Sequence, residues 1–97
     1  FLILDEPTSA LDLSHQVLMM QLVSGLARRG IGVIVVSHDL NLATHFADNV
    51  IVFDKGSVVA EGPPDKILSE RLIFDVFGIG PCVIKHPETG KNIVINW

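Results

Sequence analysis

Two short polar segments each follow a run of apolar residues, and together they carry side chains suited to phosphoryl transfer. Asp5 and Glu6 come directly after four apolar residues, and His38 follows a second apolar run. Hydrated Mg²⁺ is held by one or two carboxylates and keeps several waters, so Asp5 is the candidate metal ligand. Glu6 can orient or deprotonate a water that attacks a γ-phosphate, and His38 can hydrogen-bond a phosphate oxygen or that water.

Two strands and a helix must position these residues. The continuous apolar runs at 1–4 and 31–36 predict strands buried on both faces. Residues 13–29 predict a helix between them, and Asp12 is suited to cap its N-terminus. A strand, a helix and a second strand in this order form a right-handed unit with parallel strands. The polar residues that follow both strands are therefore expected at one edge of the sheet, where ligands bind.

The rest of the chain predicts smaller elements. In chain order these are a short helix at 40–47, a hairpin of 50–53 and 57–60, a helical turn at 65–68, a helix at 70–77 and a terminal hairpin of 82–85 and 93–95. The first hairpin is indicated by Asp-Lys-Gly between two apolar runs. We therefore predict an α/β protein, with a core at 1–62 that contains parallel strands and a small α+β appendix with hairpins at 63–97.

Composition excludes several classes of function. The 97 residues carry a net charge of −4, which leaves no basic surface for a nucleic-acid backbone. The chain is 48% hydrophobic, which excludes disorder, yet no apolar run reaches the roughly 18–20 residues that a bilayer requires. Cys82, the single cysteine, excludes a disulfide scaffold and favours a reducing compartment; we expect it to be a small buried residue.

The motifs resemble those of an ATP-binding cassette (ABC) ATPase, the motor subunit of ABC transporters. Phe1–Asp5 is similar to the Walker B strand of a P-loop NTPase core, and Glu6 matches the family's catalytic glutamate. Ser9–Asp12 resembles the D-loop, which in the family lies across the interface between two ATPase subunits. His38 matches the switch histidine that senses the γ-phosphate. The similarity covers nearly the whole chain and is most specific over residues 1–62.

The resemblance implies a nucleotide site that uses ATP and Mg²⁺ in the complete subunit. The implied nucleotide-binding residues are Asp5, Glu6, Ser9, Asp12 and His38. Among these, Glu6 and His38 take the catalytic roles and Asp5 holds the metal. Asp12 fits both a helix cap and a D-loop role, and the sequence leaves both open.

The resemblance also implies partners and a location. A second ATPase subunit would form a homodimer across the D-loop, and a transmembrane permease would hold the pair on the cytoplasmic, inner face of the cell membrane. Phe74–Gly78, Cys82–Ile84 and Pro87–Gly90 are similar to the end of the importers for iron-siderophore, haem and vitamin B12. We therefore expect part of the ATP-hydrolysing subunit of an importer for iron chelates, haem or vitamin B12.

Two motifs of the family do not occur in these residues. The chain has neither the phosphate loop, G-x-x-x-x-G-K-[ST], nor the Leu-Ser-Gly-Gly-Gln signature, which in the family precede the Walker B strand. We expect a C-terminal fragment that does not hydrolyse ATP by itself. In the family, the strand that leads into the phosphate loop lies beside the strand that carries His38. Without it the fragment would keep an unpaired sheet edge and an uncovered apolar face, so a swapped or irregular oligomer is expected.

Two alternatives stay open at this point. One is a fragment of another ABC-class ATPase, from DNA repair or chromosome maintenance, although the acidic composition and the importer-like tail argue against it. The other is a truncated module that only binds a partner and catalyses nothing.

Overall fold

The computed structural model of the protein describes residues 1–78 and 80–95. The chain divides into two compact units, Phe1–His38 and Asp39–Trp97. One parallel strand pair and two antiparallel pairs are combined with helices, which confirms the predicted α/β class. The division predicted between Gly62 and Pro63 separates the motif-bearing residues from the tail, and it stays a prediction.

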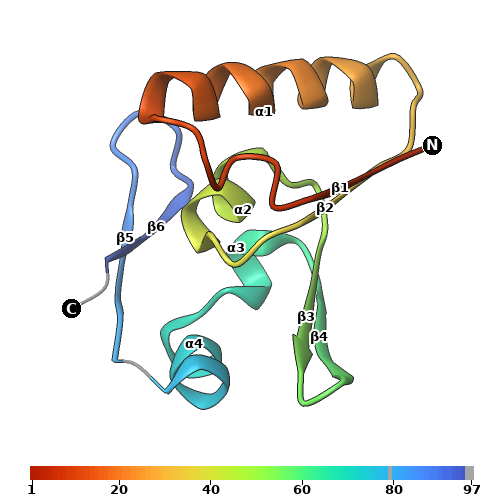
Figure 1. Ribbon diagram of the computed structural model, residues 1–97. Helices are drawn as coiled ribbons and strands as arrows, with labels where there is room; N and C mark the ends of the chain where they lie inside the picture. Colours follow the sequence, from red (N-terminus) through yellow and green to blue (C-terminus); the bar gives the residue numbers. More distant parts are fainter. Residues whose placement is uncertain (79, 96–97) are drawn as a thin grey trace. The chain divides into compact units, whose positions relative to one another are not determined.

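The first unit contains the predicted strand–helix–strand arrangement. Its elements are β1 (Leu2–Asp5), α1 (Leu13–Arg28) and β2 (Val33–Val36). The two strands are parallel, with Leu2 opposite Val33 and Asp5 opposite Val36. Figure 1 shows α1 running alongside this strand pair. The carboxyl ends of both strands therefore meet at one edge, as the sequence predicts.

Both ends of α1 are closed by local hydrogen bonds. At the start, the Asp12 carboxylate accepts from the backbone N–H of His15 at 3.0 Å, which confirms the predicted N-cap. At the other end, Gly30 takes a φ of +90°, and Ile31 N donates across it to Leu26 O at 3.2 Å. This is the pattern by which a glycine reverses the chain after a helix. The chain thus returns directly into β2.

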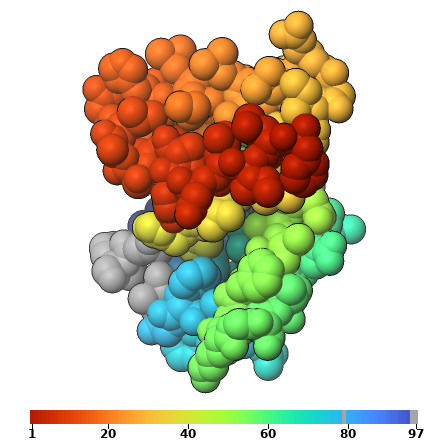
Figure 2. Space-filling model, turned by 45° about the vertical axis from the view of Figure 1, so that its right-hand side comes forward, coloured from red at the N-terminus to blue at the C-terminus, as the bar shows by residue number. Residues whose placement is uncertain are grey.

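The strands are not buried on both faces, so that expectation was wrong. Ile3 is 62% exposed, Ile34 48% and Val36 52%, whereas Leu4 and Val35 on the opposite face are only partly exposed. Among the described residues β1 pairs only with β2. The unit has one helix, α1, and one helix can cover only one face of a strand pair. The space-filling view shows the red N-terminal strand at the visible surface (Figure 2). Association through this face stays a prediction.

The second unit is built from short elements. They are α2 (Leu40–Phe46), β3 (Val50–Asp54), β4 (Ser57–Gly62), α3 (Pro64–Ile67), α4 (Glu70–Phe77), β5 (Cys82–Lys85) and β6 (Asn92–Ile95). Both predicted hairpins are confirmed as antiparallel pairs. Leu68 and Ile73 are almost completely buried and belong to its core. None of the described helices is long and apolar enough to cross a bilayer.

Cys82 is exposed, so the expectation of a buried thiol was wrong. It begins β5, which among the described residues pairs only with β6. Successive residues of a strand point to opposite faces, and in β5 only Val83 is partly buried. Cys82 and Ile84 therefore share the face that solvent reaches.

The terminal hairpin is attached to α2 through backbone groups. Nδ2 of Asn41 donates to Val94 O at 3.0 Å, and Val94 N donates back to Oδ1 of Asn41 at 2.7 Å. Lys91 Nζ donates to His45 O at 2.5 Å, at the other end of the same helix. Val94 is 3% exposed, so its peptide groups need these partners. One asparagine thus replaces the strand that would otherwise pair with this side of β6.

We expect Asn41→Asp to lower the free energy of unfolding by about 1–3 kcal/mol, because an ionised carboxylate cannot donate to Val94 O. The measurement is urea unfolding of the protein at pH 7. Asn49→Asp adds the same charge at an exposed asparagine outside this contact and serves as the control. Equal unfolding free energies for the two variants would contradict the role given to Asn41.

Candidate functional site

The structure brings Glu6 and His38 into direct contact. Glu6 follows the last residue of β1, and His38 lies two residues beyond the end of β2. Nδ1 of His38 lies 2.7 Å from Oε1 of Glu6. The side chain of His38 is 84% exposed and that of Glu6 is 32% exposed. The sequence predicts that these residues share one sheet edge, but it does not predict that they touch.

The backbone of Glu6 is held in an uncommon conformation. Its φ is +50°, in the left-handed region, where an L-residue loses about 1–2 kcal/mol. Its N–H donates to Val36 O at 2.8 Å, and its carbonyl accepts from Ser9 N at 3.3 Å and from Ser9 Oγ at 3.1 Å. Strain of this kind persists where the surroundings determine the conformation, and it is frequent at functional sites. The predicted site residue Ser9 therefore binds the main-chain carbonyl of Glu6 and not its carboxylate.

The contact between Glu6 and His38 determines which nitrogen of the imidazole carries a proton. An ionised carboxylate only accepts hydrogen bonds, so Nδ1 of His38 carries a proton in this arrangement. Nε2 then accepts in the neutral ring and donates only when the ring is doubly protonated. Oε2 of Glu6 makes no hydrogen bond with the described residues and is available to a water.

Asp5 is exposed at the end of β1, and its carboxylate makes no hydrogen bond or ion pair with another described side chain. Over residues 1–78 and 80–95 no group of three or more metal-ligating side chains converges. A closed structural metal site is therefore not built by these residues. A single accessible carboxylate does fit Mg²⁺, which takes one or two protein oxygens and completes its octahedron with water and phosphate.

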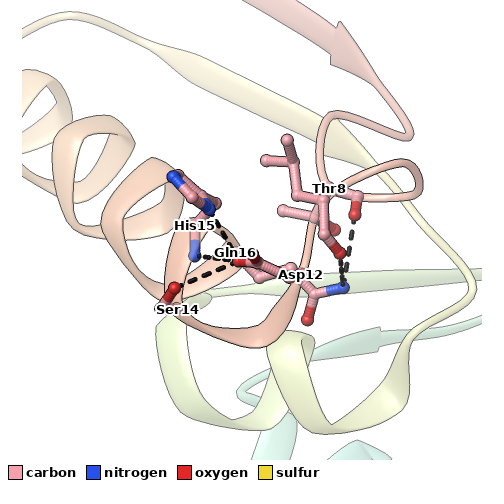
Figure 3. Close-up of polar contacts among 6 residues, drawn as sticks. Thr8, Asp12, Ser14, His15 and Gln16 are labelled. Atoms are coloured by element: carbon pink, nitrogen blue, oxygen red, sulfur yellow. Dashed lines mark hydrogen bonds and ion pairs between the residues drawn. The ribbon is translucent and has the colours of Figure 1, made fainter.

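The turn between Glu6 and α1 is fixed by a glutamine that sequence reasoning missed. Nε2 of Gln16 donates to Leu11 O at 3.1 Å and to Thr8 O at 3.3 Å (Figure 3). Thr8 is 4% exposed, and its carbonyl also accepts from Leu11 N at 3.1 Å. The signal available in the sequence was a long amide side chain in the first turn of a helix, where it can reach back to the preceding loop.

Asp12 is the N-cap residue of α1, and among the described residues its carboxylate makes no hydrogen bond or ion pair with Asp5, Glu6 or His38. Its Oδ1 accepts from His15 N and from Ser14 Oγ, and it lies 2.6 Å from Nδ1 of His15 (Figure 3). These bonds, led by the one from the His15 backbone, hold the pKa of the Asp12 carboxyl below its usual value of 3.8. The D-loop role of Asp12 stays a prediction.

Similarity to curated proteins covers nearly the whole chain. It is 48% identical to the hemin import ATP-binding protein HmuV of Rhodococcus jostii, over 97% of this chain and 32% of that protein. The HmuV proteins of Rhodopseudomonas palustris and Plesiomonas shigelloides are 49% and 46% identical, over 97% and 93% of this chain. The chain spans about a third of the length of these relatives. No protein-family model matches it.

Solved structures give the same assignment. A structure described as an inward-facing metal-chelate type ABC transporter matches with a TM-score of 0.81 at 26% identity, over 99% of this chain and 39% of that one. CbiO1 of Clostridium perfringens, part of the ABC transporter complex CbiONQ, matches with a TM-score of 0.64 at 32% identity, over 75% of this chain and 30% of that one. The resemblance to a C-terminal part of an ABC transporter ATP-binding subunit is thereby confirmed.

The hydrogen bonds at Asp12 lead to a pH prediction. Because the folded-state pKa lies below 3.8, the ionised carboxylate stabilises the fold at neutral pH, and this contribution is lost as the pH falls through the lowered pKa. We expect the carboxyl carbon of Asp12 to titrate below 3.8 in an NMR experiment. His15→Ala should raise the midpoint only part of the way, since the backbone N–H still donates. A wild-type midpoint at or above 3.8 would show that the cap bonds do not favour the ionised form.

Proposed function

We propose that this chain is the C-terminal part of the ATP-hydrolysing subunit of an ABC importer, and that Glu6 and His38 act at its γ-phosphate. The observation that carries the proposal is the 2.7 Å contact between Nδ1 of His38 and Oε1 of Glu6, at the carboxyl ends of two parallel strands. It joins the two residues that match the family's catalytic glutamate and switch histidine. The HmuV relatives support the same subunit.

In this proposal Glu6 is the general base. Its Oε2 accepts a hydrogen bond from the attacking water and takes the proton as the water oxygen bonds to the γ-phosphorus. The bond between that phosphorus and the β,γ-bridging oxygen breaks in the same step, and ADP leaves. The hydrogen bond from His38 to Oε1 keeps the carboxylate facing the edge of the sheet. Asp5 would hold Mg²⁺, which when bound neutralises charge on the phosphate oxygens.

His38 has two ways to meet a γ-phosphate oxygen. As an imidazolium it donates from Nδ1 to Glu6 and from Nε2 to the phosphate at once. As a neutral ring protonated on Nδ1, it must leave Glu6 before it can donate to phosphate. Only in the second case does the hydrogen bond at Glu6 break when a phosphate is present, and such a change is the behaviour required of a residue that senses the nucleotide.

The partners follow from the same proposal. Ser9–Asp12 would face a second ATPase subunit in a homodimer, in which ATP closes the pair and hydrolysis reopens it. Both subunits would attach to a transmembrane permease and thus lie on the cytoplasmic, inner face of the membrane. The part that carries these motifs would be residues 1–62, and residues 63–97 would form the appendix.

Haem is the proposed cargo of the complete transporter. The three curated relatives named above are called hemin import proteins. The segments Phe74–Gly78, Cys82–Ile84 and Pro87–Gly90 resemble the end of importers for iron chelates, haem and vitamin B12. The import names do not favour an ATPase of DNA repair or chromosome maintenance. The measurement of ATP hydrolysis by the complete subunit, given below, separates the proposal from a non-enzymatic interaction module.

We expect a polypeptide of these 97 residues to show no saturable Mg-ATP binding up to millimolar nucleotide, measured by titration calorimetry. The phosphate loop, whose backbone amides grip the β- and γ-phosphates, does not occur in its sequence. The complete subunit should bind under the same conditions. Micromolar binding by the 97 residues would mean that other groups cradle the phosphates.

In the complete subunit, Glu6→Gln should lower kcat for ATP hydrolysis by about 10²–10⁴-fold, because an amide cannot accept the proton. The KM for ATP should stay within a few-fold, since Glu6 acts on the water. Glu61→Gln removes an exposed carboxylate of β4 and is the matched control. Loss of activity in both variants, or in neither, would argue against Glu6 as the base.

A further inference from the structure

We propose that Gln16 is a positioning residue for Glu6, which it holds through the turn between β1 and α1. The inference rests on the function proposed above, in which Glu6 activates water. Among the described residues Gln16 makes no hydrogen bond with Glu6 or His38, and it lies in the first turn of α1. Its effect is transmitted through backbone carbonyl groups of the turn residues 8–11.

The amide of Gln16 is used as a double donor. It lies within hydrogen-bond distance of the carbonyl oxygens of Leu11, at 3.1 Å, and Thr8, at 3.3 Å, and both contacts are partly buried. A glutamine amide has two N–H groups, so one side chain can serve both carbonyls. Figure 3 shows Gln16 directed from the helix back toward Thr8. The two ends of the turn are thereby attached to a helix whose own start is capped by Asp12.

The turn residues 8–11 hold the backbone conformation of Glu6. Ser9 follows Thr8 directly and gives two hydrogen bonds to the Glu6 carbonyl, from its N–H and its Oγ. These bonds hold Glu6 at a φ of +50°. If Thr8 moves, Ser9 moves with it and the left-handed conformation of Glu6 loses its support. A small displacement of a reacting group is enough to reduce the rate substantially.

The chain offers variants that isolate the donor groups. Gln16→Glu keeps size and shape but turns carboxylate oxygens toward two carbonyl oxygens, and Gln16→Met keeps length without any donor. Gln21 is an exposed glutamine of the same helix with no hydrogen bond to the turn. Gln21→Glu and Gln21→Met are therefore matched controls for charge, polarity and helix propensity.

The experiment measures ATP hydrolysis by the complete subunit. We expect Gln16→Glu and Gln16→Met each to lower kcat at least about tenfold while the KM for ATP changes less than about twofold, because only the placement of the base is altered. Both Gln21 variants should keep wild-type constants. An unchanged kcat in both Gln16 variants, or a rise in KM that accounts for the loss, would overturn the proposal.

Hydrogen exchange supplies a readout that does not depend on activity. In the Gln16 variants, amide exchange should become faster in the peptide that spans residues 6–12 and stay unchanged elsewhere. Faster exchange over the whole subunit would overturn the proposal, since Gln16 would then support the fold in general. A wild-type subunit without ATPase activity would refute the proposed function instead, and the exchange of residues 6–12 would still decide whether Gln16 holds the turn.

Discussion

The left-handed backbone of Glu6 is the constraint on which the rest of the site depends. It is held from β2 through the bond to Val36 O and from the following turn through the two bonds from Ser9. Strain of this kind persists only where the surroundings determine the conformation, so we expect it to depend on both supports. The parallel register of β1 and β2 and the shape of the turn must therefore both be correct before the carboxylate can meet His38.

The start of α1 provides the second support. Asp12 fixes where the helix begins, and Gln16, one turn later, fixes how the preceding loop lies on it. Helix ends expose N–H groups that need acceptors, so a capped start is a rigid point in a small protein. The start of α1 thus serves as the reference that places the Glu6 carboxylate, which lies six residues before the cap residue Asp12.

Local signals made most of the fold predictable. Apolar runs, the Asp12 cap and the glycine after α1 depend on neighbours in sequence, and the structure agrees with each. Exposure was not predictable in the same way: Ile3 and Cys82 lie in strands, but how much of a strand is covered depends on what packs on it. The contact of His38 with Glu6 and the bonds of Gln16 depend on side-chain direction, which spacing alone does not give.

Most residues of the site serve structure and chemistry together, and this makes their roles hard to separate by substitution. Ser9 supports the backbone of Glu6 and also belongs to the segment proposed to face a second subunit, while Asp12 caps α1 and belongs to that segment too. Removing either side chain would change both functions at once. Gln16 reaches the turn only through carbonyl groups, so its donors can be removed without altering any side chain that touches nucleotide, metal or partner in the proposed mechanism. It is therefore the position at which the geometry of the turn can be varied while the chemical groups of the site stay in place.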